Sequence, residues 1–264
     1  MRSTFFSLLA LAVFVYLCFC VYLYLFQRSF IYFPTPATAG APAEELWFDT
    51  GNARLRIWRL HAERPDAIVY FGGNAEDVAL NIPQFSDYFS ARAVYLVNYR
   101  GYGGSSGVPT EAGLYRDAEA VFDFVKVSHR RISLIGRSLG CSVATHLAAM
   151  RSIDRLVLIT PFDSLASLAR EFYPIFPTSL LLKDKHDSSS RADRIKVPVL
   201  MLVAEHDEII PYANSERLSA AIDPALVAVK VIDDTAHNSI GASPEYGRAL
   251  RAFMAQGAGR SARP

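Results

Sequence analysis

Apolar side chains are concentrated in the first part of the chain. Residues 5–26 (FFSLLALAVFVYLCFCVYLYLF) contain no charged residue, and Gln27 and Arg28 close the run. As a helix this run spans about 33 Å at roughly 1.5 Å per residue, enough to cross a bilayer core of about 30 Å. Three tyrosines lie in its second half, as is typical of a membrane interface. The pattern predicts one transmembrane helix within residues 1–28.

A cleaved signal peptide is the alternative to such an anchor. Its apolar region would be shorter, and small residues would mark a cleavage site. The bulky segment 28–33 (RSFIYF) follows here, so we expect an uncleaved, single-pass signal-anchor. Arg2 precedes the run, whereas Glu44 and Glu45 come after it. The positive-inside rule then favours a domain on the exoplasmic or periplasmic side.

After this run, short apolar stretches alternate with helical patterns. The predicted strands are 53–60, 67–71, 93–97, 132–135, 155–159, 198–203 and 226–232. Several are nearly continuous in Val, Ile and Leu, which is typical of parallel strands buried on both faces. Helical spacing predicts a helix capped by Thr110 and two more over 139–150 and 212–222. The alternation predicts an α/β domain with helices on both faces of the sheet.

Composition and charge limit the possible functions. We expect a linker over 29–43, which includes the proline- and alanine-rich stretch PTPATAGAPA, one domain over 44–256 and a flexible tail over 257–264. The 27 Lys and Arg nearly balance the 26 Asp and Glu, which argues against a nucleic-acid-binding protein. The three cysteines lack metal-ligand spacing, and we expect neither a metal nor a cofactor.

The pattern G-x-S-x-G, which can place a serine nucleophile on a tight strand-to-helix turn, occurs twice. Ser138 in GRSLG follows a predicted strand and directly precedes a predicted helix. Ser105 in GGSSG lies in a glycine-rich loop, with Pro109 behind it and no strand leading into it. Ser138 is therefore the candidate nucleophile, and residues 103–107 are interpreted as a structural loop.

A nucleophilic serine needs a histidine that accepts its proton and a carboxylate that orients the histidine. In hydrolases with this turn the chain order is serine, acid, histidine. His237 follows the last predicted strand and is the candidate base. Asp207 follows the strand before it and is the candidate acid, with Asp163 as second choice. His186, in the polar run KDKHDSSS, is predicted to lie in a solvated loop.

An oxyanion formed during acyl transfer needs backbone donors. One is the N–H of the residue after the nucleophile, which is Leu139 here. The second is expected from the loop after strand 67–71, which reads FGGNAED. Asn74 in this loop is the candidate; a tight turn without a catalytic role is the alternative.

These residues together resemble the α/β-hydrolase superfamily. They resemble most closely its membrane-anchored, single-span group, which includes lysophospholipid and monoacylglycerol lipases and protein depalmitoylases. The matching stretches are RSFIYFPTP, YFGGNAED, VNYRGYGGSSG, IGRSLGCSVA, TPFDSL, FYPIFP with DKHDS, PVLMLVAEHDEIIP and TAHN. Relatives commonly carry a histidine where this chain has Gly72. The donor is a backbone amide, so we expect the oxyanion hole to survive and the packing of its loop to be affected.

The resemblance implies an eight-stranded, mostly parallel sheet with an antiparallel early strand. It also implies a lid between the sixth and seventh strands, a position that residues 163–196 fill. Phe172, Tyr173 and Phe176 make this segment strongly apolar. A helix pair packed on the core and a lid that forms an acyl pocket both account for these side chains.

The implied function is that of a membrane-anchored serine hydrolase of the carboxylesterase, lipase or thioesterase type. It would cleave carboxylic esters or thioesters, as small-molecule or lipid-like substrates, through an acyl-enzyme. A peptidase or amidase with the same triad is one alternative. A catalytically silent, membrane-anchored binding protein is another.

Overall fold

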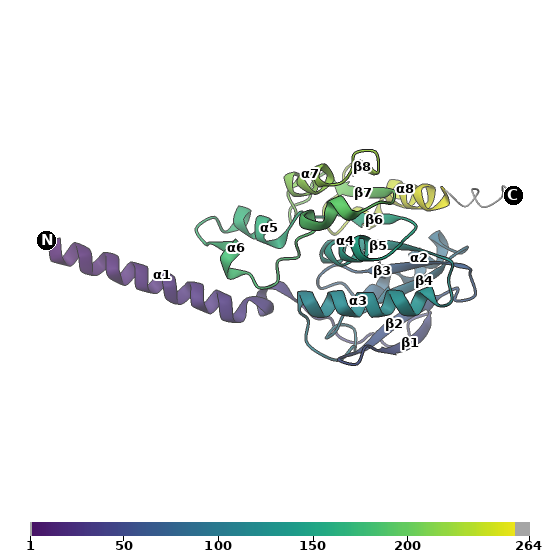
Figure 1. Cartoon of the computed structure of the whole chain (residues 1–264), viewed down its shortest axis with the longest axis horizontal. Coiled ribbons are helices and arrows are strands. Elements are labelled where there is room, and N and C mark those ends of the chain that lie inside the picture. Colours follow the sequence, from purple (N-terminus) through teal and green to yellow (C-terminus); the bar gives the residue numbers. More distant parts are fainter. Residues whose placement is uncertain (1, 257–264) are drawn as a thin grey trace.

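A long helix precedes an eight-stranded sheet in the computed structural model, which describes residues 2–256 (Figure 1). This helix, α1 (Arg2–Ile31), extends away from the sheet, and most of its apolar side chains are exposed. It is long and apolar enough to cross a membrane. It includes the first three residues of the predicted linker. The predicted tail at 257–264 lies outside the described residues.

The sheet is mostly parallel, as the resemblance implied. Its strands are β1 (Glu44–Asp49), β2 (Arg54–Leu60), β3 (Asp66–Phe71), β4 (Ala93–Val97), β5 (Arg131–Arg137), β6 (Leu156–Ile159), β7 (Val199–Ala204) and β8 (Val227–Ile232). They lie in the order β1-β2-β4-β3-β5-β6-β7-β8, and only β2 pairs antiparallel, with β1 and β4. The prediction of eight strands with an antiparallel early strand is confirmed.

Helices cover both faces of this sheet. The helices after α1 are α2 (Ile82–Tyr88), α3 (Glu111–Lys126), α4 (Leu139–Met150), α5 (Leu165–Phe172), α6 (Thr178–Leu181), α7 (Tyr212–Ala221) and α8 (Pro244–Ala255), with short 3₁₀ turns at Val78–Asn81, Ser189–Arg194 and Ile240–Ala242. Buried side chains of α3, α4 and α7 share one core cluster, and those of α2 and α8 share the other. The prediction of helices on both faces is confirmed.

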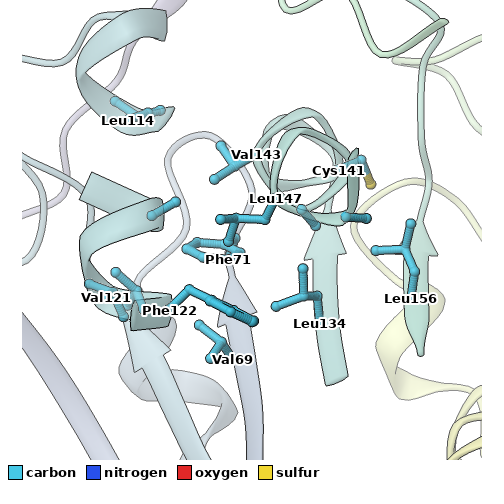
Figure 2. Packing of buried hydrophobic residues seen from close by; sticks show 14 of the residues in the cluster. Val69, Phe71, Leu114, Val121, Phe122, Leu134, Cys141, Val143, Leu147 and Leu156 are labelled. Carbon is cyan, nitrogen blue, oxygen red and sulfur yellow. The ribbon is translucent and has the colours of Figure 1, made fainter. Parts of the chain in front are cut away.

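Side chains of β3 alternate between these two clusters. Val69 and Phe71 belong to the cluster under α3 and α4, whereas Tyr70 belongs to the opposite one. Figure 2 shows Phe122 of α3 and Leu147 of α4 near Phe71. Full burial of one such side chain stabilises the fold by roughly 1.5–3 kcal/mol. This packing fixes the carboxyl end of β3 against the start of α4, where the candidate site lies.

Candidate active site

Ser138 occupies a strained turn between β5 and α4. Its φ of 49° and ψ of −114° are rare for a residue with a side chain. Its N–H donates to the Ile159 carbonyl at 2.8 Å, and its carbonyl accepts from the Cys141 N–H at 2.9 Å. The predicted strand–turn–helix context of this serine is confirmed.

The two glycines of GRSLG allow backbones to approach around this turn. A Cβ at Gly136 would lie 2.4 Å from the Gly140 carbonyl oxygen. A Cβ at Gly140 would lie 2.0 Å from the Phe71 carbonyl oxygen. No side chain fits at either position, so α4 begins directly against the ends of β3 and β5.

His237 and Asp207 lie in hydrogen-bond contact. The His237 Nδ1 is 2.9 and 3.0 Å from the two Asp207 carboxylate oxygens, and the side chains are only 5% and 3% exposed. Asp207 Oδ1 also accepts the backbone N–H groups of Ile209 and Ile210. The Asp207 carboxylate is thus held by the imidazole and by backbone N–H groups. Because it engages Nδ1 of His237, Nε2 is the ring nitrogen that can accept a proton.

Arg137 joins the serine turn to the histidine loop. Its guanidinium donates to the His237 carbonyl at 3.2 Å and to Asn238 Oδ1 at 3.0 Å. It also pairs with Glu76 at 2.8 Å. Because Arg137 immediately precedes Ser138, the two loops adjoin at the carboxyl edge of the sheet. Within residues 2–256, no hydrogen bond links the Ser138 hydroxyl to His237.

The loop after β3 is the third part of the site. A Cβ at Gly73 would lie 3.6 Å from the Ser138 Cβ. The backbone N–H of Asn74 has no acceptor in the described part of the chain. The Leu139 N–H is the first of α4 and has no partner within the helix. Both predicted oxyanion donors are therefore available near the serine turn.

The Asn74 side chain joins this loop to the end of the anchor. Its Oδ1 accepts the Phe33 N–H at 3.0 Å and the Tyr102 hydroxyl at 2.7 Å. Its Nδ2 donates to the Ile31 carbonyl at 2.6 Å. Burial raises the pKa of Tyr102 to about 12, so its hydroxyl remains a donor at neutral pH. We call these four residues the anchor–loop contact; no local pattern in the sequence indicates it.

Gly72 is the position at which the resemblance implies a histidine. A Cβ there would lie 2.7 Å from Val78 Cγ1 and 3.3 Å from Glu76 Cδ. These two side chains fill the space that a side chain at residue 72 would need. The loop is therefore closely packed with glycine at this position.

The prediction of a solvated His186 is wrong. Its side chain is fully buried, with Nδ1 2.7 Å from Ser142 Oγ and Nε2 2.9 Å from the Tyr32 hydroxyl. Tyr32 also donates to Asp184, and Arg28 pairs with that carboxylate at 2.9 Å. Burial lowers the pKa of His186 to about 4, so the ring is neutral at pH 7. Asp184 and His186 of this polar run are buried because their side chains bond to residues distant in sequence.

The remaining candidates have structural contacts. Ser105 is buried, and its Oγ accepts the Arg56 N–H and donates to the Asn98 carbonyl. Asp163, the second-choice acid, pairs with Arg217 at 2.9 Å and accepts from Asn214 at 3.0 Å. These contacts occupy the polar groups of Ser105 and Asp163, and none of them involves His237.

Of the three residues predicted to form a lid, Phe176 packs against α1. Phe176 stacks on Tyr16 at 5.7 Å and lies 5.5 Å from the Phe19 ring. Phe172 and Tyr173 are 52% and 61% exposed. No residue of α5 is buried, which argues against a helix pair packed on the core.

One exposed cluster could hold a cation by its spacing. Ligand atoms of Glu205, His206 and Asp234 lie within 4.8 Å of one another. All three residues are exposed, and the Glu205 carboxylate already accepts the Asp234 N–H at 2.9 Å. Nothing else at this cluster points to a ligand.

Comparisons with known proteins agree with the fold. The profile of the alpha/beta hydrolase family matches residues 71–187. An uncharacterized protein of Mycobacterium tuberculosis is 35% identical over 210 residues, which cover 74% of this chain and 75% of the relative. The bem46 protein of Schizosaccharomyces pombe is 28% identical over 212 residues, with 75% and 71% covered. An esterase of Pyrococcus furiosus shares the fold, with a TM-score of 0.67 at 18% identity over 84% of this chain and 98% of the esterase.

Proposed function

Because the chain belongs to the alpha/beta hydrolase family, we propose that it is a membrane-anchored serine hydrolase that cleaves carboxylic esters or thioesters. Family membership supports hydrolysis. The observation that carries the serine mechanism is the buried Asp207–His237 hydrogen bond beside the strained turn at Ser138. The chain order of serine, acid and histidine agrees with it.

In the proposed mechanism, the Ser138 hydroxyl gives its proton to His237 Nε2 as the oxygen attacks the substrate carbonyl carbon. Asp207 keeps the proton of Nδ1 in place and stabilises the imidazolium. The N–H groups of Leu139 and Asn74 donate to the oxyanion of the tetrahedral intermediate. The imidazolium then protonates the leaving alcohol or thiol, and an acyl-enzyme remains. Water, deprotonated by His237, hydrolyses this ester and restores the serine.

The surroundings of the site favour an acyl or lipid-like substrate. α1 is long and apolar enough to cross a membrane, and Phe176 stacks on it. Phe172 and Tyr173 precede Phe176 in the same segment and are exposed. Each buried CH₂ of an acyl chain contributes about 0.8 kcal/mol to binding. The charge around α1 favours a catalytic domain on the exoplasmic or periplasmic side.

Labelling with a fluorophosphonate tests the proposal, since this probe reacts with an activated serine. The full chain should be labelled, and Ser138→Ala should not be. Ser128→Ala changes an exposed serine with no side-chain hydrogen bond among the described residues, and it should be labelled normally. A folded chain that is not labelled would favour a binding protein. Parallel assays with p-nitrophenyl esters, a thioester and a peptide amide then separate esterase from amidase.

A further inference from the structure

The segment between α5 and the end of α6 runs along α1. The Tyr16 hydroxyl donates to the Ile175 carbonyl at 2.8 Å, and Phe176 packs on the same part of α1. At the other end of this segment, Gln27 Nε2 donates to the Leu181 carbonyl at 3.0 Å. Tyr16 precedes Gln27 by eleven residues, or about 16 Å at roughly 1.5 Å per residue. The segment therefore follows a long part of the apolar helix, as the position of α5 and α6 in Figure 1 also indicates.

Charged residues begin at the same level on both segments. Residues 172–182 (FYPIFPTSLLL) contain no charge, and we call them the lid tip. On its carboxyl side, Asp184 pairs with Arg28, the first charged residue after the apolar run of α1. On its amino side, Glu171 pairs with Arg217 at 2.6 Å. The apolar run of α1 and the carboxyl end of the lid tip thus end at the same level.

Most backbone N–H groups of the lid tip are paired, although those of Ile175 and Ser179 have no acceptor among the described residues. Pro174 and Pro177 carry no N–H group. The N–H groups of Tyr173 and Phe176 donate to the Ala169 and Tyr173 carbonyls at 2.8 and 3.1 Å. Unpaired backbone groups are costly in hydrocarbon, so this pairing favours contact with lipid.

The side chains of the lid tip are nevertheless exposed. Ile175 and Leu180 are 72% and 80% exposed, and Phe172 and Tyr173 are more than half exposed. A contiguous apolar surface of this kind marks a site of interaction with a membrane or another partner. Its continuity with a helix that is itself long and apolar enough to cross a bilayer identifies the partner.

We propose that the lid tip is embedded among the lipid acyl chains around the carboxyl-terminal half of α1. The domain then has a second contact with the bilayer, and Ile175 lies deeper in it than Leu180. This inference concerns the surface of the protein and does not depend on the proposed hydrolysis.

Tryptophan quenching by brominated phosphatidylcholine tests the proposal in the full chain reconstituted in nanodiscs. The native Trp47 and Trp58 belong to β1 and β2, and the unsubstituted protein supplies their baseline. Ile175→Trp and Leu180→Trp should each add emission that is mostly lost in brominated lipid. Bromines deeper in the acyl chain should quench residue 175 better than residue 180.

Two variants serve as references. Phe14→Trp is on α1 and should be quenched, whereas Val127→Trp follows α3, is 86% exposed as valine, and should not be. If residue 175 is as insensitive as residue 127 while residue 14 is quenched, the proposal is overturned although the anchor stands. If residue 14 is also insensitive, both membrane contacts are rejected. Far-UV circular dichroism verifies that each variant is folded.

Discussion

The carboxyl edge of the sheet and the lid tip are built in opposite ways. At the sheet edge, Asp207 and His237 are buried and hydrogen-bonded to each other. In the lid tip, Ile175 and Leu180 are largely exposed and apolar. The polar side chains of the sheet edge find their partners within the protein, whereas the apolar side chains of the lid tip need contact with another apolar phase. Substitutions at the edge should therefore affect every substrate, and substitutions in the lid only those that contact it.

The largest effect is expected at the carboxylate of the edge. Asp207→Asn should lower kcat by about 10⁴-fold, because an amide no longer holds the imidazole in the tautomer that accepts a proton. Steady-state hydrolysis of short and long p-nitrophenyl esters measures this loss, which should be equal for both. Glu205→Gln removes an exposed carboxylate from the same loop and should retain activity. Full activity of Asp207→Asn would contradict the proposed acid.

A substitution that disturbs backbone packing at the sheet edge should have the next largest effect. Gly140→Ala places a methyl group 2.0 Å from the Phe71 carbonyl oxygen, so α4 or β3 must move. We expect a loss of about 1–3 kcal/mol in the free energy of unfolding, together with reduced kcat. Gly241→Ala is the matched control, since its Cβ would have no neighbour within 4 Å. Denaturant unfolding of both variants in detergent compares them; equal stabilities would contradict the close approach.

The buried His186 should make stability depend on pH. Burial outweighs the opposite influence of Glu111 and Asp184 and lowers its pKa to about 4, against an ordinary value of 6.5. Between these values the unfolded chain binds the extra proton, so stability is complete above about pH 6.5 and is lost as the pH falls towards 4. The loss should reach about 3 kcal/mol at most. In His186→Gln the unfolding free energy should vary less with pH over this range, and an unchanged profile would refute the assignment.

The smallest effect is expected from charge in the lid. Phe172→Asp and Phe176→Asp should lower activity on long-chain esters several-fold and leave short-chain esters nearly unaffected, because each lost CH₂ contact is worth about 0.8 kcal/mol. Leu80→Asp, 77% exposed as leucine and outside the lid, is the control. Rates across a series of acyl lengths provide the comparison. Equal losses of activity on short and long acyl chains would contradict the expectation that the lid affects only the substrates that contact it.

Local patterns predicted much of this molecule. The strand, turn and helix around Ser138 depend on neighbouring residues, so their arrangement could be read from GRSLG and its flanks. β1 was missed because its side chains alternate between exposed and half-buried and form no continuous apolar run. His186 was misplaced because its partners Tyr32 and Ser142 are distant in sequence. The catalytic roles of Ser138, Asp207 and His237 stay predictions until they are assayed.

The anchor–loop contact joins segments that lie on the two sides of the proline-rich stretch. Asn74 is held by backbone groups of Ile31 and Phe33, on the amino-terminal side of the proline-rich stretch. A protease that cleaved within residues 34–43 would release a domain whose oxyanion loop had lost its covalent tie to those groups. Under the proposed function, shedding from the membrane would then silence the enzyme rather than free it. A soluble fragment intended for crystallisation or screening should accordingly begin upstream of Arg28, so that Arg28, Tyr32 and Phe33 travel with the domain.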